Sequence, residues 1–284
     1  MKKGIMLILK VLLISGTCLG QNSFSIQGKI IDADTKKEIA YANIGIPAEH
    51  IGTASQKDGS FKFELSNEFK NETLQISAIG YHTKEVPVSN LIETKDTVLN
   101  LSPKIYQMDH VTVTDKKGKS RWIGKKVRPL IGSASYGLRT HPERLGAAFA
   151  FRVSWEGNLP IKILHSRMFL MRDRDDPLKI RCGIAKADSL TGLPSNEFYN
   201  RRNTTTAAKE KGWFTCDFDE EYLWVDEKEF FVVFEWLSEQ DKRIVPMVAI
   251  DPFFKSDAYI RHHSFDEWKK PFVDNLIYSI KIEY

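Results

Sequence analysis

Apolar and polar residues alternate through the stretch from Phe24 to Val88, and this alternation constrains the fold more than any other feature of the chain. A period of two buries one face of a strand and leaves the other in water, as in antiparallel sheets that pack face to face. Turn-forming residues separate the alternating runs at Asp32–Asp34, at Lys57–Gly59 and at Gly80. The stretch therefore predicts a small β-sandwich.

A second region with the rhythm of a β-sandwich extends from Gly146 to Tyr284. Turn signals such as Glu156–Asn158 and Thr191–Pro194 separate its apolar runs. Strands are predicted at Ala147–Trp155, Ile161–Leu170, Lys179–Ala187, Phe214–Phe218, Phe230–Leu237, Ile244–Ile250 and Leu276–Ile282. Strands at this spacing indicate a jelly-roll or related sandwich.

The residues between these regions, 115–145, are rich in Lys, Arg, Gly, Ser and Pro and show little periodicity. This composition predicts a basic linker. The segment Lys116–Arg128 contains seven cations and no acid. It is interpreted as a solvated spacer, with binding to a polyanion as the alternative. The predicted fold is all-β, with residues 21–114 as one β-sandwich, for which the family resemblance described below implies a transthyretin/Ig-like fold, and residues 146–284 as a jelly-roll-like sandwich.

The first 20 residues have the pattern of a secretory signal peptide. Met1–Lys3 supplies the positive start, Ile5–Ile14 is apolar, and cleavage is predicted between Gly20 and Gln21. Lipid attachment at Cys18 is the competing interpretation. A transmembrane helix needs about 20 apolar residues, so no membrane span is expected after the signal is removed. The mature chain is expected to be exported.

The order of the N-terminal pieces resembles that of a known family. These pieces are FSIQGKIIDADTKKEIAYANIGI, TASQKDGSFKFEL and TLQISAIGYHTKEVPV. Together they resemble the carboxypeptidase-like regulatory domain, a transthyretin-like module found in exported proteins of Bacteroidota. The resemblance implies a non-catalytic β-sandwich and a place in the cell envelope, in the periplasm or at the outer membrane.

The net charge of +4 includes three lysines of the predicted signal peptide, Lys2, Lys3 and Lys10. The mature chain is therefore nearly neutral, and nucleic acid is not expected as a partner. Of the cysteines, Cys182 and Cys216 remain, and the alternation around each points it inward. In an oxidising compartment the two could form a disulfide, and the alternative is a pair of buried thiols that act as small apolar side chains.

Glu235 is the most informative single residue, because it lies inside the apolar run Phe230–Leu237. A carboxylate on a buried face is costly unless it is paired. Arg152, Arg167 and Arg181, each on another predicted strand, are candidate partners. A structural ion pair is the favoured interpretation, while contact with a ligand and a role as a catalytic acid are the alternatives.

Trp155 and Trp213 lie at the ends of predicted strands, where they could stack on a glycan, although aromatic residues in β-sandwiches mostly pack in the core. The sequence predicts no metal site, no cofactor and no catalytic motif. The predicted function is that of a non-enzymatic envelope protein, a binding or assembly module for an envelope protein or glycan. The alternatives are a glycan-binding module and a hydrolase of envelope glycan or peptide with Glu235 at its centre.

Overall fold

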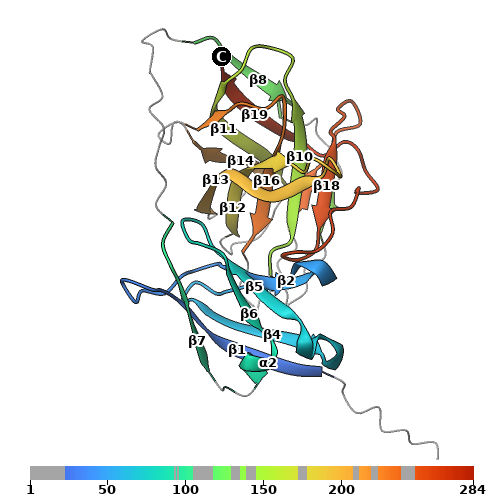
Figure 1. Cartoon of the computed structure of the whole chain (residues 1–284). Helices are drawn as coiled ribbons and strands as arrows, with labels where there is room; N and C mark the ends of the chain where they lie inside the picture. Colours follow the sequence, from blue (N-terminus) through green and yellow to red (C-terminus); the bar gives the residue numbers. More distant parts are fainter. Residues whose placement is uncertain are drawn as a thin grey trace, which may run out of the picture.

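The computed structural model describes residues 23–92, 94, 96–104, 118–128, 135–138, 145–171, 178–206, 211–218, 223–237 and 247–284. They form two all-β parts, one stacked on the end of the other, with the C-terminus at the far end of the second part (Figure 1). The predicted signal peptide, with Gly20 and Gln21, lies outside the described residues. No helix among the described residues is long and apolar enough to cross a membrane.

The first domain consists of a three-stranded and a four-stranded sheet. The three-stranded sheet has the order β4-β1-β7, with β1 antiparallel to β4 and parallel to β7. The four-stranded sheet is antiparallel, with the order β3-β2-β5-β6. Their bounds are β1 Ser23–Asp32, β2 Asn43–Ile46, β3 Ile51–Ala54, β4 Ser60–Ser66, β5 Thr73–Ser77, β6 Lys84–Pro87 and β7 Thr97–Leu101. Short helical turns are η1 Pro47–Glu49, η2 Asn67–Asn71 and α2 Ser89–Ile92.

The core of this domain follows the predicted alternation. In β4, Phe61, Phe63 and Leu65 are buried while the residues between them are exposed. They pack in one cluster with residues of the other sheet, such as Ile44 and Ile76. The prediction of a small sandwich in this part of the chain is confirmed.

Asp32 is the last residue of β1, and its carboxylate links this strand to the turn that contains Tyr81. Its Oδ1 accepts hydrogen bonds from the backbone N–H groups of Asp34 (2.8 Å) and Thr35 (2.7 Å). Its Oδ2 accepts one from the Tyr81 hydroxyl (2.8 Å). The bond from the Thr35 N–H, followed by that from Tyr81, lowers the pKa of Asp32 to about 2. Burial, together with the Asp32 carboxylate, raises the pKa of Tyr81 to about 12.

We expect replacement of Asp32 by Asn to destabilise the first domain in a pH-dependent way. The folded pKa of about 2 lies below the ordinary value of 3.8, so the unfolded chain binds the proton more tightly. The contribution of the carboxylate is therefore fully present above about pH 4 and is lost as the pH falls toward 2. Urea unfolding of D32N and wild type, followed by far-UV circular dichroism, should show a stability difference that shrinks across this window. Y81F, which removes one donor, should show a smaller difference, and a difference independent of pH would contradict the assignment.

The second domain packs a five-stranded sheet against a seven-stranded one. The five-stranded sheet has the order β13-β12-β16-β10-β18 and is antiparallel. The path of the seven-stranded sheet is β8-β19-β11-β17-β9, and β14 and β15 also pair with β11. Their bounds are β8 Ser120–Gly124, β9 Ser135–Gly137, β10 Ala148–Ser154, β11 Ile161–Leu170, β12 Leu178–Ala187, β13 Pro194–Thr206, β14 Gly212–Asp217, β15 Trp224–Val225, β16 Glu229–Trp236, β17 Met247–Ala249, β18 Ala258–Arg261 and β19 Tyr278–Glu283.

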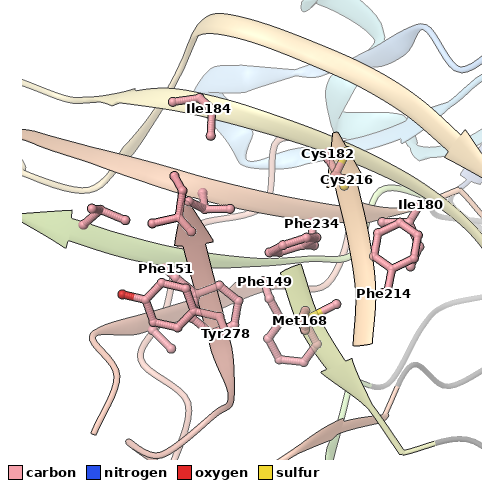
Figure 2. Packing of buried hydrophobic residues seen from close by; sticks show 14 of the residues in the cluster. Phe149, Phe151, Met168, Ile180, Cys182, Ile184, Phe214, Cys216, Phe234 and Tyr278 are labelled. Atoms are coloured by element: carbon pink, nitrogen blue, oxygen red, sulfur yellow. The ribbon is translucent and has the colours of Figure 1, made fainter. Parts of the chain in front are cut away.

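Aromatic side chains fill the space between the two sheets (Figure 2). Phe151 stacks on Tyr278 of the opposite sheet with ring centroids 4.4 Å apart, and Phe234 meets Phe214 edge-on. All seven strands predicted in this region are present, β11 with the predicted bounds and the others with shifted ends, and the prediction of two β-sandwiches is confirmed. Strands β13, β15 and β18 were not predicted.

Cys182 and Cys216 lie in this core, one on each sheet, and both are fully buried (Figure 2). The prediction that both point inward is confirmed. The disulfide and the alternative of two buried thiols both stay predictions. Sulfur among phenylalanine rings is a favourable apolar environment, so both residues act as core side chains.

The predicted linker contains two strands of the second domain, and in this respect the prediction was wrong. β8 pairs with β19, and β9 pairs with β17. Arg167 on β11 explains why β8 is held, because its guanidinium lies between the rings of Trp122 (4.0 Å) and Trp213 (4.1 Å). The many cations of the segment hid the strand pattern, because the two adjacent apolar residues of β8, Trp122 and Ile123, give no visible alternation. The second domain therefore includes residues before 146.

Candidate functional site

Glu235 lies at the centre of a row of residues that crosses the outer face of the five-stranded sheet. In the strand register, Glu235 lies opposite Arg181 of β12 on one side and Ala148 of β10 on the other. Ala148 in turn lies opposite Arg261 of β18. Directly opposed residues share a face of the sheet. The small side chain of Ala148 leaves room for Arg261 to reach across it to Glu235.

Each oxygen of the Glu235 carboxylate accepts a hydrogen bond from one arginine. Arg181 donates from Nε to Oε2 over 2.7 Å, and Arg261 donates from Nη2 to Oε1 over 2.9 Å. Only 1–2% of the surface of each of the three residues is exposed. We call Arg181, Glu235 and Arg261 the junction cluster.

Burial acts on the charge of one arginine of the junction cluster. It lowers the pKa of Arg261, an effect that the Glu235 carboxylate opposes and that nearby Arg181 reinforces. Two cations thus share one anion. The remaining N–H groups need neutral acceptors, because an unsatisfied buried donor costs about 1–3 kcal/mol. Arg261 finds one in the carbonyl of Gly146, at 3.3 Å, and its guanidinium lies 4.9 Å from the ring centre of Trp268.

The first domain supplies the acceptors that Arg181 needs. Arg181 donates from Nη1 to the carbonyl of Tyr41 (2.5 Å) and from Nη2 to Oδ1 of Asn43 (2.6 Å). The hydroxyl of Ser264 in the second domain also donates to Asn43 Oδ1, over 3.3 Å. Further along the contact, the Leu145 N–H donates to Thr53 Oγ1 over 3.3 Å. Directional bonds from a buried cluster therefore fix one domain against the other.

A phenylalanine ring packs on a pair of glycines beside the cluster. Gly45 and Gly52 lie opposite each other in β2 and β3, and Phe265 covers them. A Cβ at Gly52 would lie 2.4 Å from the Ser264 carbonyl oxygen and 2.8 Å from Cδ2 of Phe265. A Cβ at Gly45 would lie 2.5 Å from the same Cδ2. Gly52 is required because the second domain approaches so closely, and at Gly45 the backbone of the neighbouring strand β3 excludes a side chain as well. At the rim, His50 lies 3.5 Å from Glu267.

Comparison with known proteins identifies the first domain. Residues 26–113 match the family model of the CarboxypepD_reg-like domain. The N-terminal sandwich is a CarboxypepD_reg-like domain. This confirms the resemblance to the carboxypeptidase-like regulatory domain. No curated protein matches the chain.

Two solved structures show distant similarity. One is a DUF3823 family protein from Parabacteroides merdae, a member of the Bacteroidota; it is 9% identical, with 80% of this chain and 95% of that chain covered and a TM-score of 0.20. The other is a structure of the infectious bursal disease virus Gx strain, 9% identical, with 92% and 57% covered and a TM-score of 0.23. Similarity at this level carries no argument about the present chain.

The structure confirms the interpretation of Glu235 as part of a buried ion pair. Of the three candidate partners, only Arg181 is correct. Arg152 lies near the other end of the sheet, where it pairs with Glu229 (3.1 Å) and Asp257 (2.9 Å). Arg167 lies on the other sheet between two tryptophans. Arg261 was missed because β18 has only four residues, too few for a recognisable alternation.

Trp155 and Trp213 do not lie on a common face. Trp155 is buried in the core, donates from Nε1 to the Asn158 carbonyl (2.9 Å) and contacts the ring of Tyr284. Trp213 lies opposite Phe169 on the outer side of the seven-stranded sheet, packed with Arg167. The two indoles therefore lie on opposite sides of the seven-stranded sheet, Trp155 in the core and Trp213 on the outer side. They cannot form one platform for a sugar chain.

Among the described residues, no three His, Cys, Asp or Glu side chains are grouped so that they could hold a metal ion. The described part of the CarboxypepD_reg-like domain has a shallow polar hollow of about 250 Å³, lined by Gln27, Gly28, Gln56, Ser60, Phe61, Lys62 and Asp96. A Cβ on Gly28 would lie 2.1 Å from the Thr97 carbonyl oxygen, so this glycine serves the close β1–β7 contact.

We expect Glu235→Gln to destabilise the second domain by about 3–5 kcal/mol, because it leaves two buried guanidinium groups without a carboxylate. All six tryptophans lie at position 122 or later, so their fluorescence reports on this domain during denaturant unfolding. Glu229→Gln is the matched control on the same strand. Its side chain is 53% exposed, and loss of its pair with Arg152 should cost less than about 1 kcal/mol. Equal stability of the two variants would show that the junction cluster is not structural.

Proposed function

We propose that this chain is a non-enzymatic exported protein of the bacterial cell envelope that acts as a binding or assembly module. The observation that carries the proposal is the junction between the domains. Domains of one chain move relative to each other by default, because their interfaces are small and polar. Here Arg181, Glu235 and Arg261 are bonded into the contact, and acceptors on Tyr41 and Asn43 complete it. Such a unit presents surfaces of both domains in a fixed geometry.

The geometry favours this proposal over a hydrolase centred on Glu235. A catalytic acid must reach its substrate to within hydrogen-bond distance. The Glu235 carboxylate is 1% exposed and both of its oxygens accept bonds from guanidinium groups. Both oxygens of the Glu235 carboxylate are therefore engaged in hydrogen bonds at the domain junction. The glycan-binding alternative depended on Trp155 and Trp213 acting together, and these two side chains lie apart.

Two features support the proposed envelope location. The N-terminal domain is of the CarboxypepD_reg-like type, and it resembles modules of exported proteins. The first 20 residues have the charge, apolar stretch and small-residue exit of a signal peptide. We expect N-terminal sequencing of the chain purified from the envelope fraction to begin at Gln21. A chain that retains Met1, recovered from the cytoplasm, would contradict the location.

The function is tested by crosslinking the tagged mature chain in the native envelope and analysing the captured proteins and glycans by mass spectrometry. Three chains are compared: wild type, Gly52→Val and Gly212→Val. A side chain at Gly52 meets Ser264 and Phe265 and should separate the domains, whereas a Cβ at Gly212 meets nothing within 4 Å. Small-angle scattering should show a larger maximum dimension for G52V alone.

We expect a specific partner to be captured by wild type and by G212V and to be several-fold depleted with G52V, because the partner needs both domains in register. A partner captured equally by all three chains would contradict the role of the rigid junction. An eluate identical to that of the tag alone would contradict a binding or assembly role.

A further inference from the structure

Two phenylalanine side chains project almost fully into solvent from adjoining loops of the second domain. Phe253, in the connection between β17 and β18, is 81% exposed, and Phe272, between β18 and β19, is 88% exposed. A single exposed apolar residue needs no explanation. Here two exposed phenylalanines lie on loops that are hydrogen-bonded to each other. Their apolar surface stabilises nothing in the isolated chain, and such surfaces mark interaction sites.

The two loops hold each other in place. The Asp251 N–H donates to the Asn275 carbonyl (3.0 Å), and the Ser256 N–H donates to the Asp274 carbonyl (2.6 Å). The Asp251 carboxylate then orients the turn that carries Phe253, because its Oδ1 accepts the Phe253 N–H over 2.9 Å. Phe272 rests against Tyr136, whose ring centroid is 4.8 Å away. Both phenylalanines are therefore presented on fixed supports.

Cations are present on these loops and on the adjoining end of β8. Lys125 lies 2.8 Å from Asp251 Oδ2, which places the end of β8 and the residues after it beside the Phe253 turn. Lys126 and Arg128 are exposed there, on either side of Val127, which is 64% exposed. On the other flank the Lys255 side chain is 89% exposed and lies 3.8 Å from Asp274, at the limit of an ion pair. We call Lys126, Arg128, Phe253, Lys255 and Phe272 the Phe253–Phe272 face.

We propose that the Phe253–Phe272 face docks on an anionic phospholipid surface. Exposed aromatic rings insert at the boundary between headgroups and acyl chains, and neighbouring lysines and arginines bind the lipid phosphates. The face offers both components on rigid loops, so little ordering entropy opposes docking. The inference rests on the proposed envelope function and deepens it by naming the surface that the module binds. A protein partner would require complementary polar groups for the same cations and is an outcome of the test.

The test is co-sedimentation of the mature chain with vesicles of phosphatidylglycerol and phosphatidylcholine (3:7), compared with phosphatidylcholine alone. We expect binding to the anionic vesicles that weakens as the salt concentration rises. The double variant F253S/F272S should bind at least about tenfold more weakly, because it loses the two rings that are buried in the lipid on docking. K126Q/R128Q should bind more weakly and lose most of the salt dependence.

Leu190→Ser is the matched control. Leu190 is 93% exposed but lies on the β12–β13 hairpin, outside the face, and its replacement should leave vesicle binding unchanged. Absence of vesicle binding, or equal losses in L190S and F253S/F272S, would overturn the proposal. Capture of one protein that depends on Phe253 and Phe272, without vesicle binding, would also overturn it. That result would leave the proposed function intact, since the latter fails only if the envelope capture experiment fails.

Discussion

The structure depends on one buried carboxylate that is shared by two buried guanidinium groups. Glu235 alone cannot satisfy Arg181 and Arg261, because ten N–H donors meet one anion with two oxygens. The other acceptors must therefore come from carbonyls and amides at fixed positions, and two of them, Tyr41 O and Asn43 Oδ1, belong to the other domain. Such a cluster adds little net stability compared with an apolar contact, but it accepts only one arrangement of its neighbours. The orientation of the two sandwiches follows from this chemistry.

The same constraint explains how far the sequence could be interpreted. A lone carboxylate in an apolar strand predicts a buried cationic partner. Arg181 was among the predicted candidates because it lies on another predicted strand. Arg261 was not, because its strand is short and the residues after it, with two histidines in succession, resemble a loop. The participation of Tyr41 and Asn43 was beyond prediction, since a backbone carbonyl and a strand-end amide carry no signature in a single sequence. The CarboxypepD_reg-like domain, by contrast, was predictable almost completely, because its core is built by local alternation and its turns by Asp and Gly.

The linker prediction failed for a related physical reason. Composition distinguishes a spacer from a strand only when the strand buries one face, and edge strands often do not. β8 is held by pairing with β19 and by stacking of Trp122 on Arg167, so its cations remain in water and dominate the composition. Arg167 also packs on the ring of Trp213, so that the arginine covers the face on which a sugar would stack. One cation–π stack thus accounts for both the missed strand and the misplaced ligand site.

The cations of the basic segment that follows β8 have two different environments. Lys125 turns back to the Asp251 carboxylate, and its hydrogen bond is the main cause that lowers the pKa of that carboxyl. Asp251 in turn fixes the backbone of Phe253. Lys126 and Arg128, the next cations along the chain, are exposed. A basic stretch that serves only as a spacer would have no reason to bond to a particular loop. Because one of its lysines bonds to the carboxylate that orients the Phe253 turn, the end of the basic segment and this turn are held together by the fold.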